Sequence, residues 1–175
     1  NWVSTLNTDG SFMKEQRRAG LGGVVRKGSG EIVMAFAKPC QFLTNNYSEV
    51  QAALFVLKWC CRRNFNHLTL EMDYLIVVNM ISGKYKIPWS LHSTIGQIQE
   101  LVQQRNITIG HCYMEGNAVA DSLAKLATQI EDSVLYLREE DMETEVRAHI
   151  YMDASKIPAF HFKTTKHSGW CFQSP

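Results

Sequence analysis

Four carboxylates in this sequence coincide with the predicted ends of secondary-structure elements: Asp9, Glu49, Asp73 and Asp121. Asp9 and Asp73 are each predicted to end a strand. Glu49 is predicted in the first turn of a helix, and Asp121 lies early in another. One acidic residue in such a place is usually a solvated cap or turn residue, because carboxylates favour helix starts and turns. Four such residues in one chain suggest that the carboxylates share one site.

A cluster of these four side chains would need a counter-charge. Carboxylates brought together without cations repel one another, which raises their pKa values and destabilises the fold. Mg²⁺ prefers hard oxygen ligands in octahedral geometry and keeps several waters, so it suits a shallow carboxylate cluster. Two such ions about 4 Å apart could activate a water and stabilise the leaving oxygen of a phosphodiester. The residue types therefore predict a site for two Mg²⁺ ions, or for Mn²⁺, that hydrolyses phosphodiesters.

The first half of the chain contains the patterns of three strands and a helix. Short stretches rich in Val, Ile, Leu and aromatic residues predict strands over residues 2–8, 20–26 and 31–37, the last two forming a hairpin. From about Asn46 the apolar residues recur at helical intervals, with Ser48 as a possible N-cap.

The second half alternates strands and helices. We expect strands over 67–72 and 107–113. We expect helices over 74–81 and 119–127, and between them a helix that contains Ile95, Ile98 and Leu101 and ends near Arg105. The order βββαβ(α)αβα predicts an α/β fold, with a five-stranded mixed sheet and helices on both faces, because parallel strands need crossover connections. Catalytic residues in such sheets gather where strands end.

Short motifs surround the four carboxylates in sequence order. They are NTDGS at 7–11, TNNYSE at 44–49, LEMD at 70–73, and His111-x5-Asn117-x3-Asp121. Together they resemble the motifs of the ribonuclease H type 1 family over about residues 2–129. The last motif is particularly similar to plant members, many of which derive from the reverse transcriptases of non-LTR retroelements.

The resemblance implies a ribonuclease H-like fold and hydrolysis of the RNA strand of RNA/DNA hybrids by two metal ions, leaving 3′-hydroxyl and 5′-phosphate ends. It implies that Asp9, Glu49, Asp73 and Asp121 bind the metal ions. His111 would assist proton transfer or product release. The residues expected to contact substrate are Gly10, Ser11, Asn45, Asn46 and Asn117. Asn45 and Asn46 could equally be helix caps. A hybrid is recognised through 2′-hydroxyls and groove shape, so cleavage should be largely independent of sequence.

Three features depart from the family pattern. Tyr74 follows the third carboxylate, where serine is common, and its bulk could alter the substrate edge of the site. The basic handle of several bacterial relatives is absent, which leaves only Lys84 and Lys86 between the middle helices and predicts weaker substrate binding. Trp59 and Trp89 are predicted to pack against apolar helical residues rather than to stack on bases.

Glycines in the predicted second strand have two interpretations. Gly20, Gly22 and Gly23 resemble the family's second strand, where absent side chains allow close approach. Ordinary strand packing explains them equally well.

The charge is distributed unevenly along the chain. Residues 1–129 contain 13 Lys and Arg against 9 Asp and Glu, and residues 130–175 contain 5 against 8. A modestly basic domain can bind nucleic acid. We expect a domain over 1–129 and an extension over 130–175 that fits no further sheet unit, is partly helical around 139–150, and could contact a reverse transcriptase or another protein. We expect a monomer.

Cysteine usage and hydropathy limit the class of protein. The five cysteines form no C-x-x-C pair, so neither a disulfide framework nor a zinc site is indicated. No apolar run is long enough for a membrane span, and the first residues resemble a strand rather than a signal peptide. We expect a nuclear or cytoplasmic protein that is not secreted.

The sequence is also compatible with two alternative functions. A domesticated module could keep the fold and bind nucleic acid or protein without catalysis. A 3′-to-5′ exonuclease of a related fold also uses four acidic residues, although the motif spacing here fits that class less well.

Overall fold

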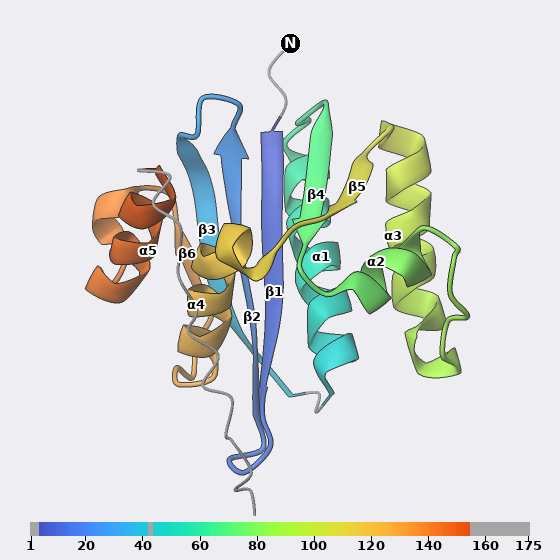
Figure 1. Ribbon diagram of the computed structural model, residues 1–175, viewed down its shortest axis with the longest axis horizontal. Coiled ribbons are helices and arrows are strands. Elements are labelled where there is room, and N and C mark those ends of the chain that lie inside the picture. Colours follow the sequence, from blue (N-terminus) through green and yellow to red (C-terminus); the bar gives the residue numbers. More distant parts are fainter. Residues whose placement is uncertain (1–3, 42–43, 155–175) are drawn as a thin grey trace, which may run out of the picture.

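The computed structural model describes residues 4–41 and 44–154 of the 175-residue chain. Six strands form one mixed sheet with helices on both faces (Figure 1). The strands are β1 (Ser4–Met13), β2 (Arg18–Lys27), β3 (Ile32–Cys40), β4 (Leu68–Met72), β5 (Thr108–His111) and β6 (Val134–Tyr136). The α-helices are α1 (Asn45–Arg62), α2 (Leu75–Ile81), α3 (His92–Arg105), α4 (Ala118–Ala127) and α5 (Thr144–Ala154). Short 3₁₀ turns are η1 (Trp89–Leu91), η2 (Met114–Asn117) and η3 (Glu139–Asp141).

The strand order of the sheet is β5-β4-β1-β2-β3-β6. The strands β1, β2 and β3 pair antiparallel through short turns, whereas β1–β4 and β4–β5 are parallel and are connected through helices. β1 was predicted to end at Asp9, and this is wrong. It continues to Met13 because its antiparallel pairing with β2 persists as far as the pair Met13–Arg18.

The predicted number of five strands is also wrong, because residues 134–136 add β6 to the outer edge of β3. Residues 130–175 were expected to contribute nothing to the sheet. β6 has only three residues in an acidic segment, which is too short for its alternation to be recognised in the sequence. It forms because the free edge of β3 offers unpaired backbone groups.

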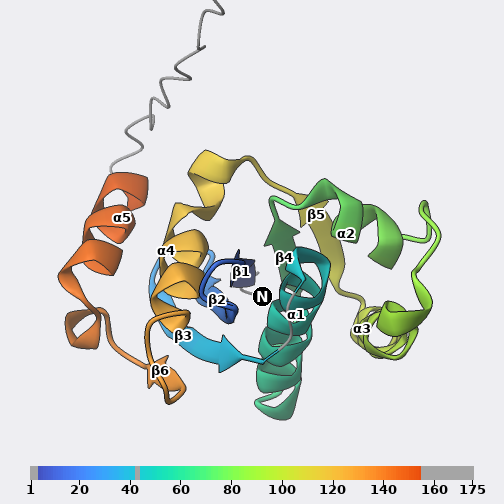
Figure 2. The same ribbon diagram turned by 90° about the horizontal axis from the view of Figure 1, so that it is seen from below.

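Two apolar cores lie on opposite faces of the sheet (Figure 2). The first lies between the sheet and helices α1, α2 and α3, with Leu6, Leu57 and Ile95 fully buried. The second lies between the sheet and helices α4 and α5, and it includes Leu123 and Val146. Part of the helix expected around 139–150 is therefore present as α5, and it covers the second core.

The glycines of β2 allow α4 to lie directly on the sheet. A Cβ atom added at Gly22 would lie 2.2 Å from the backbone nitrogen of Ala124, and one at Gly20 would lie 2.3 Å from the carbonyl oxygen of Ala124. At these two positions the absent side chain is thus needed for close approach of a helix. This helix carries Asp121, so the glycines also set the position of that carboxylate.

The two tryptophans differ in environment. Trp59 is 9% exposed and packs in the first core, as predicted. Trp89 is 88% exposed, so its predicted packing is wrong. It is the first residue of the turn η1, directly after Pro88. Within the described ranges, no helix is long and apolar enough to cross a membrane.

Candidate active site

Three of the four predicted carboxylates converge. Asp9, Glu49 and Asp73 each place one carboxylate oxygen within 4.8 Å of the other two. Asp9 and Glu49 are 7% and 4% exposed, and Asp73 is half-buried. The three residues come from a strand, a helix and the end of a second strand, so only the tertiary fold brings them together.

The parallel pair β1–β4 sets the positions of the two aspartates. Thr8 in β1 lies opposite Met72 in β4, so the next residues, Asp9 and Asp73, emerge at the same end of this pair. Gly10 then brings β1 against the beginning of α1. A Cβ atom on Gly10 would lie 2.4 Å from the backbone nitrogen of Glu49, so this contact requires glycine.

The N-terminal cap of α1 is Thr44, whose side chain accepts a hydrogen bond from the Tyr47 backbone N–H. The possible cap at Ser48 is wrong, because the Ser48 hydroxyl instead donates to the carbonyl oxygen of Asn45 at 2.9 Å. Asn45 and Asn46 follow the cap, with Asn45 exposed and Asn46 half-buried. Neither asparagine is the cap, and their predicted contact with substrate stays a prediction.

Burial and like charge raise the pKa values of the three clustered carboxyls. Burial, followed by the charges of Asp73 and Asp121, raises the pKa of Asp9 to about 7. Burial and the Asp9 charge raise the pKa of Glu49 well above its usual range, and the two carboxyl groups share a hydrogen bond. Burial also raises the pKa of Asp73. Each of the three carboxyl groups therefore ionises less readily than a free carboxyl group when no cation is bound.

Asn117 is buried and orients Asp73. Its side-chain amide donates to Asp73 Oδ1 at 3.1 Å and to the carbonyl oxygen of Thr8 at 3.0 Å. The first bond favours the ionised carboxylate and opposes the burial effect on the pKa of Asp73. The sequence pattern indicated Asn117 as a substrate contact, and this second role was missed because it depends on the juxtaposition of three elements. Contact with substrate stays a prediction for Asn117.

His111 ends β5 on the exposed side of the cluster. Its Nε2 lies 3.1 Å from the carbonyl oxygen of Asp73. The ring of Tyr113 packs edge-on against the imidazole, with 5.9 Å between the ring centroids. His111 is thus held beside the carboxylates while it remains open to solvent.

Asp121 is near the cluster but outside the group of three. Its carboxylate is half-exposed and forms an ion pair with Lys125, with 2.6 Å between Oδ2 and Nζ. The charge of Asp121 still raises the pKa of Asp9 and Asp73. The sequence motif did not indicate Lys125, although a spacing of four residues in a predicted helix is a recognisable signal for such a pair.

The residues present fit a divalent cation. Glu49 Oε2 and Asn117 Oδ1 are buried and accept no hydrogen bond from any residue that the structure describes. All three clustered ligands are carboxylates, which are the hard donors that Mg²⁺ and Mn²⁺ prefer. A cation would remove the charge repulsion and satisfy the Glu49 oxygen.

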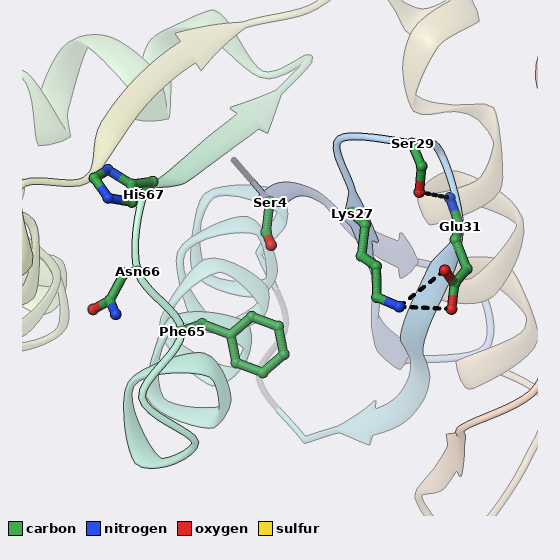
Figure 3. Close-up of a pocket in the computed structure, with 7 residues that line it drawn as sticks. All are labelled: Ser4, Lys27, Ser29, Glu31, Phe65, Asn66 and His67. Atoms are coloured by element: carbon green, nitrogen blue, oxygen red, sulfur yellow. Dashed lines mark hydrogen bonds and ion pairs between the residues drawn. The ribbon is translucent and has the colours of Figure 1, made fainter. Parts of the chain in front are cut away.

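A cavity of about 800 Å³ lies at the other end of the sheet (Figure 3). It is lined by the first residue of β1, the β2–β3 turn and residues 65–67. Lys27 in this cavity is already paired with both carboxylate oxygens of Glu31, at 2.8 and 2.9 Å. Because the cavity opens where β4 begins, and Asp73 follows the end of β4, it does not belong to the carboxylate cluster.

Comparisons with known proteins agree with this architecture. A family model described as reverse transcriptase-like matches residues 7–127. No curated protein sequence is significantly similar to the chain.

Solved structures match at low sequence identity. An N-terminal RNase H domain from Mycobacterium tuberculosis, fused to maltose-binding protein, matches with 23% identity and a TM-score of 0.68 over 74% of this chain and 95% of that one. LC11-RNase H1, isolated from compost, matches in its RNA/DNA hybrid complex with 23% identity and a TM-score of 0.66 over 72% and 96%. A foamy viral protease-reverse transcriptase in complex with RNA/DNA hybrid matches with 20% identity and a TM-score of 0.63, over 73% of this chain and 20% of that one. These matches confirm the predicted ribonuclease H-like fold.

Proposed function

This chain belongs to the reverse transcriptase-like family, and we propose that it is a metal-dependent endoribonuclease that hydrolyses the RNA strand of RNA/DNA hybrids. The observation that carries the proposal is the convergence of Asp9, Glu49 and Asp73. Hybrid binding by two structural neighbours supports the choice of substrate. The fold alone would not, because one fold hosts many functions.

Each side chain of the site has a proposed role. Asp9, Glu49 and Asp73, with Asp121, would hold two Mg²⁺ or Mn²⁺ ions. When bound, these ions supply an activated water and neutralise charge at the scissile phosphate. Asn117 would keep Asp73 oriented for such binding, since its amide donates to Asp73 Oδ1.

The exposed residues around the cluster would handle the substrate and its protons. His111 would move a proton at the leaving oxygen or assist product release, since it lies beside Asp73 and faces solvent. Gly10, Ser11, Asn45 and Asn46 would contact the backbone and minor groove of the hybrid. The position of Ser11 supports its proposed role, because residues two apart in a strand share a face and Ser11 therefore lies beside Asp9.

Cleavage of a labelled RNA/DNA hybrid tests the proposal. The purified chain should cut the RNA strand in Mg²⁺ or Mn²⁺, and Asp73→Asn should reduce the rate to background. Asp132→Asn changes an exposed carboxylate outside the cluster and serves as the matched control. A wild-type protein that leaves the hybrid intact at every metal concentration would contradict the proposal.

A module that binds without catalysis is the second candidate. It is favoured by one observation, that Lys125 neutralises the fourth carboxylate, Asp121. Such a module should bind hybrid equally in EDTA and in Mg²⁺ and leave it uncut. An enzyme should need the metal for turnover.

We also propose that the protein resides in the nucleus or cytoplasm, that it is a monomer, and that residues 130–175 contact a protein partner. We propose further that the nuclease domain spans residues 1–129 and that the residues after it form an extension. Size-exclusion chromatography of the full chain would test the monomer.

A further inference from the structure

The turn between β1 and β2 carries an exposed group of cations. Residues 13–18 are all exposed, and they include Lys14, Arg17 and Arg18 against a single acid, Glu15. In Figure 1 this hairpin projects past the ends of α1 and α4. None of the ion pairs found among the described residues involves Lys14 or Arg17.

The base of the hairpin is fixed to the helix that carries Asp121. Arg18 donates from Nη1 to the carbonyl oxygen of Thr128 at 3.2 Å, directly after the end of α4. The Thr128 hydroxyl in turn lies 3.1 Å from Met13 Sδ. Lys14 and Arg17 therefore extend from a base that is connected to the site on two sides, through β1 and through α4.

The turn has an unusual residue at its tightest point. The backbone N–H of Arg17 closes the turn on the carbonyl oxygen of Lys14 at 3.3 Å, and Arg17 has a φ of 52°. This left-handed conformation favours glycine, and an arginine adopts it at a conformational cost. The chain therefore displays a guanidinium where glycine would suit the backbone better, which points to a use for the charge.

The distance from the carboxylates suits a nucleic-acid backbone. Met13 lies four residues beyond Asp9 on the same strand, which at about 3.4 Å per residue places the turn roughly 14 Å away. A strand of a duplex carries one phosphate per about 3.4 Å of axis, so the turn lies roughly four nucleotides from a phosphate held at Asp9.

We infer that Lys14 and Arg17 bind backbone phosphates of the nucleic acid beside the carboxylate site. This inference rests on the proposed function for its substrate. It gives the chain a source of phosphate contacts on the β1–β2 side of the site, in addition to the sparse cations Lys84 and Lys86 of the α2–α3 connection. Guanidinium and ammonium groups bind phosphate without reading bases, so the contact should be independent of sequence.

Salt-dependent binding of the full chain to an RNA/DNA hybrid in EDTA tests the inference. Each lost phosphate contact should reduce the slope of log affinity against log salt by about 0.7–0.9. Arg17→Gly and Lys14→Ala should each reduce it by that amount, and the double variant by about twice as much. Arg147→Ala removes an exposed cation from α5 and should leave the slope unchanged.

Arg17→Gly also separates binding from folding. Glycine accepts the positive φ, so its thermal midpoint should equal or exceed that of the wild type. Arg17→Lys, which retains the charge, should restore most of the slope. Wild-type slopes in both Arg17→Gly and Lys14→Ala would overturn the inference.

The binding experiment, combined with the cleavage assay in Mg²⁺, distinguishes the two proposals. If the wild type cuts hybrid in Mg²⁺ and the Lys14 and Arg17 variants bind hybrid with the wild-type salt slope, the inference is overturned and the proposed function stays intact. A wild type that binds through the hairpin and never cuts overturns the catalytic function and supports the inference.

Discussion

At Asp9, burial and neighbouring negative charge act in the same direction on the carboxyl group. Both favour the protonated form, and Glu49 and Asp73 are shifted the same way. A cluster that resists ionisation when empty must release protons when it binds a cation. Metal affinity should therefore rise with pH as Asp9 ionises.

This gives a prediction for stability without metal. The folded Asp9 binds its proton more tightly than the unfolded chain, so its contribution is complete below about pH 4 and is lost as pH rises through about 7. Urea unfolding in EDTA should show the free energy of unfolding falling between pH 5 and pH 8, at up to about 1.4 kcal/mol per pH unit for one such proton. Mg²⁺ should reverse much of the loss at pH 8.

Asp9→Asn is the control, because it removes the titrating group and keeps the shape of the side chain. Its free energy of unfolding should vary less with pH over the same range. A wild-type protein that becomes more stable from pH 5 to pH 8 in EDTA would contradict the assignment of Asp9 as a buried acid with a raised pKa.

Among the elements, α4 lies in close contact with the sheet. Its backbone lies against Gly20 and Gly22 of β2, and its side chains Val119, Leu123 and Ala127 fill the second core. The helix begins just after Asn117 and carries Asp121 in its first turn. Packing of this helix and geometry of the site are therefore coupled.

Gly22→Ala should destabilise the protein by about 1–3 kcal/mol, because the added Cβ would lie 2.2 Å from backbone atoms that can move only with α4. Chemical denaturation measures the loss. Gly96→Ala in α3 is the matched control, since nothing lies within 4 Å of its added Cβ. It should stabilise the helix by about 0.5–1 kcal/mol. Equal stability of the two variants would mean that α4 does not need the close approach.

In the whole molecule, the segment after residue 129 covers apolar surface of the sheet. Tyr136, Met142, Val146 and Ile150 are at most 7% exposed and lie in the second core. Arg26 of β2 pairs with Asp153 of α5, and the Tyr136 hydroxyl donates to Glu143. These contacts link the extension to the domain that precedes it.

A chain ending at residue 129 should consequently be much less stable than one ending at residue 154. Each of the four buried side chains contributes about 1.5–3 kcal/mol, and the total is comparable with a usual stability of about 5–15 kcal/mol. Circular dichroism melting of both chains provides the test. If the shorter chain melts at the same temperature, residues 130–154 are an independent appendage.

The sequence by itself predicted the order of the main elements and four candidate carboxylates, because hydrophobic periodicity and local motifs are properties of neighbouring residues. Only the tertiary structure brings three of them, Asp9, Glu49 and Asp73, together. The sequence also indicated His111 as a site residue, and its position beside Asp73 came from the structure. Only the tertiary structure decided that Asn117 holds Asp73, that Lys125 pairs with Asp121, and that Trp89 is exposed. β6 likewise depends on an edge that β3 provides from almost a hundred residues away. These features are contacts between distant segments, and no local pattern encodes them.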